Sequence, residues 1–163
     1  MHIKINKNYL YINDYKIKCC IGKRGIKKNK IEGDLTTPKI TLKFKYVLYR
    51  PDRVKNLYSR IKKIKINKKM GWCDDYRSNK YNMLINYPFN YSSEKLFRKD
   101  NIYDIVIVTD YNTNPVFKKK GSAIFLHIAK KNYSPTKGCI AISKKDMRLL
   151  LKKTKKRTKL EFF

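Results

Sequence analysis

The sequence is poor in acidic residues and histidine, and it lacks long apolar runs. Its 163 residues include 12 Asp and Glu against 41 Lys and Arg, with two histidines. No run of about eighteen apolar residues occurs, so no transmembrane helix is expected. The N-terminal residues Met1–Asn6 are basic but show no apolar h-region and no small-residue cleavage site. We therefore expect no signal peptide from the sequence.

Metal-binding patterns are also missing. The four cysteines are Cys19, Cys20, Cys73 and Cys139, and no two of them form a C-x-x-C pair. With only two histidines to add, they do not make a convincing tetrahedral zinc site, and we expect no metal and no cofactor. A bridge between Cys19 and Cys20 is not expected either, because successive side chains of a strand point to opposite faces. The cysteine count leaves the redox compartment open.

What the chain has in excess is positive charge. The balance is 41 − 12 = +29, and such a field favours acidic partners such as nucleic acid, anionic lipid or an acidic wall polymer. The lysines are, however, spread through most segments, as a lysine-, isoleucine-, asparagine- and tyrosine-rich composition typical of an AT-rich genome would give. No RNA- or DNA-binding motif is recognisable, so nucleic acid is not the expected partner. A basic binding module without catalysis stays as the alternative function.

Length and composition favour one folded domain. A chain of 163 residues, 42% apolar and 13% aromatic, can bury one core but is short for two domains. We expect a single domain over residues 1–163, with a core at about 9–153 and a basic C-terminal segment at 152–163.

Hydrophobic periodicity predicts a mainly β domain. The surest strand is Ile40–Tyr49, which alternates apolar and polar residues for most of its length. Only two segments suggest helix: Ser93–Arg98, and a capping box at Ser143–Asp146 that opens a helix through Leu151. Gly71–Pro88 has no sustained period and predicts a long ordered loop. The other expected strands are Tyr9–Ile12, Tyr15–Ile21, Ile61–Ile66, Tyr103–Thr109, Ser122–Ala129 and Leu160–Phe162.

The stretch from Gly121 to Ile142 carries the candidate chemistry. An apolar run ends near His127, a loop follows, and Gly138-Cys139 precedes the next apolar run, 12 positions after the histidine. This arrangement can hold an imidazole beside a thiol, where the imidazole takes the thiol proton and stabilises the thiolate. Gly138 permits a sharp turn that brings backbone N–H groups toward a reacting carbonyl, as an oxyanion hole requires. The alternative for Cys139 is a buried structural cysteine.

These residues also resemble a known family. His127 followed by Thr136-Lys137-Gly138-Cys139 is similar to the signature of L,D-transpeptidases with a YkuD-type catalytic domain. Two further blocks match in order: Lys30–Asp34 with Thr37-Pro38, and Gly71–Asp75 with Tyr81-Asn82. The resemblance extends from about Ile17 to Leu151, which is most of the chain.

The resemblance implies a β-sandwich or barrel-like catalytic fold with one or two short helices, acting as a monomer on peptidoglycan stem peptides. Cys139 would be the nucleophile, His127 the general base and acid, and Gly138 part of the oxyanion hole. Candidate substrate contacts are Thr136, Lys137, Trp72, Asp74 and Tyr81. The reaction would pass through a thioester and end in cross-linking or hydrolysis, which share the same nucleophile and base. The family implies a cell-envelope or periplasmic location, although no export signal is visible.

Three positions depart from the family pattern. Lys137 stands where many members have histidine, and Ala141 stands where many have Arg or Asn, so a side chain that would orient the donor stem is missing. Ile128 follows the histidine, where the family often has a small or polar residue. That change is tolerable if a backbone carbonyl steadies the imidazole. The Glu32–Asp34 block is expected to be a fold-defining turn more than a site.

Overall fold

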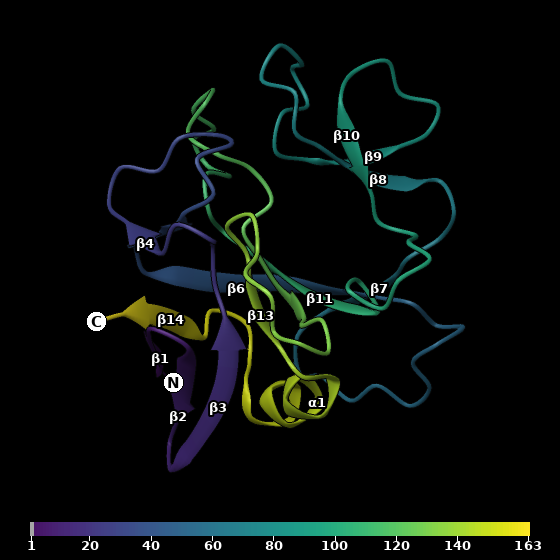
Figure 1. Ribbon diagram of the computed structural model, residues 1–163. Helices are drawn as coiled ribbons and strands as arrows, with labels where there is room; N and C mark the ends of the chain where they lie inside the picture. Colours follow the sequence, from purple (N-terminus) through teal and green to yellow (C-terminus); the bar gives the residue numbers. More distant parts are fainter. Residues whose placement is uncertain (1) are drawn as a thin grey trace.

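A closed β barrel dominates the computed structural model, which describes residues 2–163 (Figure 1). Nine strands form one sheet in the order β11-β12-β13-β3-β2-β1-β14-β6-β7, and β6 also pairs with β11, which closes the barrel. This confirms the expected mainly β, barrel-like fold. The strands are β1 (His2–Asn6), β2 (Tyr9–Ile12), β3 (Tyr15–Cys20), β6 (Leu42–Tyr49), β7 (Lys63–Lys65), β11 (Ile105–Thr109), β12 (Phe125–Ile128), β13 (Ile140–Ile142) and β14 (Lys159–Phe162).

Most strands fall where periodicity predicts them, with ends displaced by a few residues. Every residue of β11 is buried, as a β-branched run covered on both faces predicts. The two ends of the chain lie side by side in the barrel wall, where β1 and β14 pair in parallel (Figure 1). The strand at β14 is confirmed, but β1 was not predicted, although Ile3 and Ile5 alternate with exposed neighbours and are fully buried.

One helix, α1 (Lys144–Lys153), covers part of the barrel. Ser143 is its N-cap: the hydroxyl accepts from the Asp146 N–H at 3.0 Å and donates to the Asp146 carboxylate at 2.6 Å. The predicted N-cap is therefore confirmed, but the Asp146 carboxylate accepts from the Ser143 hydroxyl and not from the backbone N–H that closes a capping box. Met147, Leu150 and Leu151 join the barrel core. No helix within residues 2–163 is long and apolar enough to cross a membrane.

A second, smaller sheet lies at the other side of the molecule from α1 (Figure 1). It contains β10 (Ser93–Lys95), β8 (Met70–Cys73) and β9 (Leu84–Asn86), all antiparallel. The predicted helical turns at Ser93–Arg98 are wrong, because this segment pairs with β8 and so short a helix would not be stable alone. The predicted loop at Gly71–Pro88 is wrong at its ends, which form β8 and β9. A pair of two-residue strands, β4 (Ile26–Lys27) and β5 (Thr37–Pro38), completes the fold.

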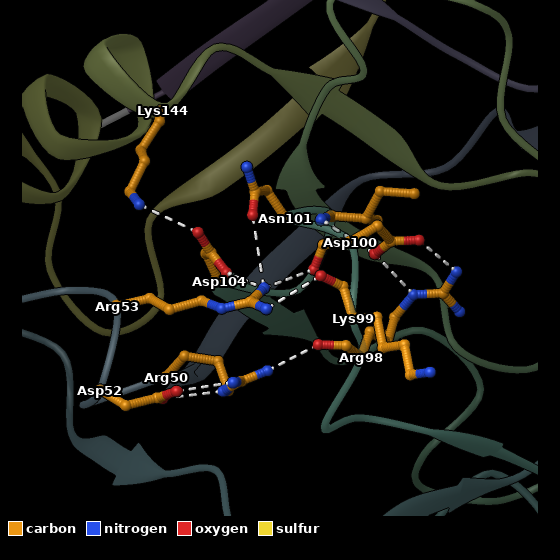
Figure 2. Close-up of polar contacts among 10 residues, drawn as sticks. Arg50, Asp52, Arg53, Arg98, Lys99, Asp100, Asn101, Asp104 and Lys144 are labelled. Carbon is orange, nitrogen blue, oxygen red and sulfur yellow. Dashed lines mark hydrogen bonds and ion pairs between the residues drawn. The ribbon is translucent and has the colours of Figure 1, made fainter.

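An ion-pair cluster ties α1 and the segment after β6 to the loop before β11 (Figure 2). The side chain of Asp104, 2% exposed, pairs with Arg53 at 3.3 Å and with Lys144 at 2.9 Å. Arg53 also donates to the backbone carbonyls of Lys99 and Asp100, both at 2.8 Å. We call Arg53, Asp104 and Lys144 the Asp104 cluster. It fixes the loop that leads into the central strand β11.

Candidate active site

His127 lies in β12, Cys139 directly precedes β13, and the two side chains face the same side. β12 and β13 run in parallel, with Leu126 opposite Ile140 and His127 opposite Ala141. Leu126 and Ile140 pack into the barrel core, so alternation turns His127 and Cys139 to the other face. Both line a cavity of about 570 Å³. The fold thus brings together the thiol and the imidazole that the sequence paired.

The Cys139 thiol is held by backbone groups at the cavity wall. Its sulfur donates to the Ala123 carbonyl at 2.9 Å and accepts from the Phe125 N–H at 3.4 Å. Burial of the sulfur raises the pKa of Cys139 to about 12. The Phe125 N–H acts against that rise, the charge of Glu94 adds to it, and the charge of Lys30 opposes it. The resting residue is therefore a thiol at neutral pH, and it needs a base to become a nucleophile.

His127 can supply that base. Its Nδ1 lies 2.9 Å from the Ile128 carbonyl oxygen, and because a carbonyl only accepts, Nδ1 carries the proton and Nε2 is free to take one. Burial lowers the pKa of His127 to about 4, so the ring is neutral at pH 7. The Tyr103 ring packs edge-on against the imidazole, with centroids 5.5 Å apart. The backbone carbonyl of Ile128 steadies the ring, which explains why isoleucine is tolerated after the histidine.

Cys139 follows a turn that is stabilised by the hydroxyl group of Thr136. Thr136 Oγ1 accepts from the Gly138 N–H at 3.0 Å and donates to the Cys139 carbonyl at 2.6 Å. Thr37 Oγ1 donates to the Gly138 carbonyl at 2.8 Å. The Gly138 N–H is thus engaged within the turn, whereas the Cys139 N–H has no hydrogen-bond acceptor among residues 2–163. The free N–H beside the thiol is that of Cys139.

The predicted substrate contacts separate into two groups. Thr136, Lys137 and Asp74 line the cavity with the thiol. Trp72 and Tyr81 do not line it, and both side chains are buried. The Trp72 ring packs edge-on against Phe125, with centroids 4.9 Å apart. Trp72 therefore packs against β12, the strand that carries His127, and the Tyr81 hydroxyl donates to Glu32, which lines the cavity.

Asn82 is a supporting residue to which the sequence analysis gave no role. Its Oδ1 accepts from the Trp72 indole N–H and from the Ala123 N–H, each at 3.0 Å. Its Nδ2 donates to the carbonyls of Tyr111 and Asn112. Ala123 has a φ of +50°, uncommon for alanine, and its carbonyl accepts the Cys139 thiol proton. Asn82 fixes this backbone; the signal for it was its place in the Tyr81-Asn82 block.

Other residues that line the cavity were not predicted from the sequence as site residues. Glu94 and Arg98 pair at 3.5 Å across the cavity wall, and burial raises the pKa of Glu94. Cys20 also lines the cavity, whereas Cys19 packs into the barrel core, so the two face opposite ways and are unbridged as predicted. Lys30 and Glu32 line the cavity too, so the Lys30–Asp34 block is part of the site as well as a turn.

The comparison with known families agrees with this geometry. The model of the L,D-transpeptidase catalytic domain, YkuD, matches residues 2–161, almost the whole chain. A comparison with curated proteins gives no significant match. The matched family acts on peptidoglycan and is usually associated with the cell envelope. With a match of this extent, the chain belongs to the L,D-transpeptidase family with a YkuD-type catalytic domain.

Proposed function

We propose that this protein is a cysteine-dependent acyltransferase that remodels peptidoglycan stem peptides through a thioester on Cys139. The observation that carries the proposal is the common placement of His127, in β12, and Cys139, directly before the adjacent strand β13, at the wall of one cavity. Both groups face this cavity, and the neutral imidazole has a free Nε2 that can take the proton of the thiol.

In the first step His127 Nε2 takes the thiol proton, and the Cys139 sulfur attacks a stem-peptide carbonyl at an L–D bond. A carbon–sulfur bond forms, and the carbonyl oxygen becomes an oxyanion. When this intermediate collapses, the carbon–nitrogen bond breaks and His127 returns the proton to the departing amine of D-alanine. In the resting protein the thiol proton faces Ala123 instead, so the thiol must rotate toward the imidazole when substrate binds.

The oxyanion needs backbone donors, and the Cys139 N–H is available for it. One such donor is typically worth about 10²–10³ in rate. Gly138 contributes by its conformation: its φ is +146°, and a Cβ there would lie 2.8 Å from the Thr36 carbonyl oxygen. Glycine thus allows the turn to pack against Thr36 while Cys139 faces the cavity.

The thioester is then resolved by the side-chain amine of a neighbouring stem, giving a cross-link, or by water, giving a shortened stem. Both outcomes use the same nucleophile, base and oxyanion donors. At Ala141, where many members carry Arg or Asn, the methyl group lines the cavity and offers no hydrogen bond to the donor. Analysis of products from purified muropeptides separates dimers from shortened monomers and so assigns the reaction.

The test of the nucleophile uses matched cysteine variants. The purified protein is incubated with a tetrapeptide stem or a carbapenem and measured by intact mass spectrometry. Cys139→Ser should form no adduct, whereas Cys73→Ser, which removes another buried thiol, should form it as the parent does. A Cys139→Ser protein that still turns over the tetrapeptide would refute the assignment.

A second candidate, a polyanion-binding module, is favoured by one observation. A hollow of about 380 Å³ on β6 and the segment before β14 is lined by Lys43, Lys45, Lys62, Lys156 and Arg157. Its single acid, Asp110, accepts from the Lys43 backbone N–H at 2.8 Å. Salt-dependent retention of an acidic polymer together with an unreactive Cys139 would support this function over catalysis.

A further inference from the structure

Lys30 is a buried lysine at the wall of the reactive cavity. Its side chain is 4% exposed, and it is the one lysine that is buried among residues 2–163. Lysines are almost never fully buried unless paired. The burial of this lysine beside the turn that carries Cys139 therefore calls for a reason.

Two glycines make room for the Lys30 side chain. A Cβ at Gly121 would lie 3.0 Å from Lys30 Cε, and a Cβ at Gly138 would lie 3.4 Å from Lys30 Nζ. Both glycines have positive φ, +103° and +146°. The ammonium thus reaches the residue that directly precedes Cys139, and a side chain at either position would crowd it.

Asp34 holds the ammonium in place. Asp34 Oδ1 lies 2.8 Å from Lys30 Nζ, and the carboxylate also accepts from the N–H groups of Ile31 and Thr36. Although burial alone favours the neutral acid, Lys30 and these N–H groups hold the pKa of Asp34 well below its usual range. Asp34 therefore stays a carboxylate and faces the Lys30 side chain at neutral pH.

The ammonium retains a hydrogen for the cavity. Besides Asp34, Nζ contacts only the Ile31 carbonyl, at 3.4 Å, among residues 2–163. An ammonium has three N–H donors, so these contacts account for two. The charge of Lys30 also acts on Cys139: it lowers the pKa of the thiol, whereas burial and the charge of Glu94 raise it.

We propose that Lys30 is an electrostatic positioning residue, whose ammonium stabilises the negative charge that forms at the Cys139 sulfur and on the adjacent oxyanion. His127 is neutral before the reaction, so it offers no fixed positive charge to the sulfur. Asp34 orients the ammonium and weakens its field. The inference rests on the proposed role of Cys139. The other charged groups around the cavity are Glu32, Asp74, Glu94, Arg98, Lys130 and Lys137; Arg98 is paired with Glu94 and Asp100.

The two partners of the ion pair give the test, because they act on the thiol in opposite directions. Lys30→Met removes the cation and should slow alkylation of Cys139 by iodoacetamide. Asp34→Asn leaves the cation without its counter-charge and should accelerate the same reaction. One unit of thiol pKa changes the thiolate fraction about tenfold, partly offset by the lower nucleophilicity of a more acidic thiol. We therefore expect the alkylation rate of Cys139 to fall about threefold or more in Lys30→Met and to rise about threefold or more in Asp34→Asn.

Peptide-level mass spectrometry measures the rate at Cys139 separately from the three other cysteines, at several pH values. Lys137→Met, which removes an exposed lysine that lines the same cavity, is the matched control and should change the rate less than Lys30→Met. Both variants of the pair break the same contact, so a purely structural role predicts changes of the same sign. Equal slowing in Lys30→Met and Asp34→Asn, or no change in either, overturns the proposal.

If either single variant fails to fold, a double variant can be measured in its place. Lys30→Gln/Asp34→Asn replaces the ion pair by a neutral hydrogen-bonded pair, and alkylation should be slower than in the parent, because Lys30 is the nearer charge to the thiol turn. Alkylation as fast as in the parent contradicts the proposal. These rates do not depend on turnover of peptidoglycan, so a failure here is distinguishable from a failure of Cys139→Ser to abolish the adduct.

Discussion

Two buried ion pairs in this protein have different surroundings. In the Asp104 cluster one buried carboxylate meets two cations, and Arg53 is further tied to backbone carbonyls (Figure 2). In the other, Lys30 meets one carboxylate, Asp34, and the ammonium lines the cavity next to the turn of Cys139.

These surroundings suggest that the Asp104 cluster has a structural role and that the Lys30–Asp34 pair acts on the reactive thiol. Arg53 directs its hydrogen bonds to Asp104 and to neighbouring backbone carbonyls, and Lys144 pairs with the same carboxylate, so these contacts hold α1 and the loop before β11 together. The Lys30 ammonium has one N–H group that is not taken up by Asp34 or Ile31, and it lines the cavity. Its charge acts on a thiol that burial holds neutral. The first arrangement should govern stability and the second reactivity.

The largest expected effect lies on the reactive side. His127→Ala removes the base that takes the Cys139 proton, and adduct formation with a carbapenem should fall by roughly 10²–10⁴. Intact mass spectrometry over time measures the rate. Asp104→Asn, the matched change in the structural cluster, should form the adduct at nearly the parental rate. Equal losses in both variants would remove the distinction between the two regions.

Gly138→Ala should cause the next largest loss of adduct formation. The new Cβ would lie 2.8 Å from the Thr36 carbonyl oxygen and 3.4 Å from Lys30 Nζ, at a φ of +146°. We expect adduct formation to fall by about tenfold or more and stability to fall by roughly 1–3 kcal/mol. Gly25→Ala is the control, because its φ is +78° but its Cβ would meet nothing within 4 Å. That variant should lose stability only, as measured by denaturant unfolding.

Asp104→Asn should reduce stability without changing the thiol. The substitution removes a buried charge that two cations face, and the free energy of unfolding should fall by about 1–3 kcal/mol. Both cations keep some contact with solvent, which limits the loss. Urea unfolding and the Cys139 alkylation rate are measured on the same sample. A changed alkylation rate with unchanged stability would contradict the structural role of the Asp104 cluster.

The last prediction concerns pH. Burial lowers the pKa of His127 from 6.5 to about 4, so between these values the unfolded chain binds a proton that the folded chain does not. Stability should therefore decrease as pH falls from 6.5 to 4, and His127→Gln should flatten this dependence. By the same shift, adduct formation should persist below pH 6.5 and decline only near pH 4. A decline centred at pH 6.5 would mean that the imidazole is not buried.

The sequence predicted the elements whose signal is local. Strict alternation located β6, a capping-box pattern located α1, and the order of His127 and Cys139 on consecutive segments paired them. Ser93–Lys95 was misjudged because its partner, β8, lies about twenty residues away in the chain, and local pattern does not reveal such pairing. Lys30 and Asn82 stood in family-like blocks without a role, since only the closed fold places them at the thiol turn.

The most direct test of the account is the site of the covalent intermediate. The protein is incubated with a stem tetrapeptide, quenched in acid and digested, and the modified peptide is identified by mass spectrometry. The account predicts a tripeptide acyl group on Cys139, lost in Cys139→Ser and strongly reduced in His127→Ala. An acyl group on another residue, or turnover by Cys139→Ser, would contradict it.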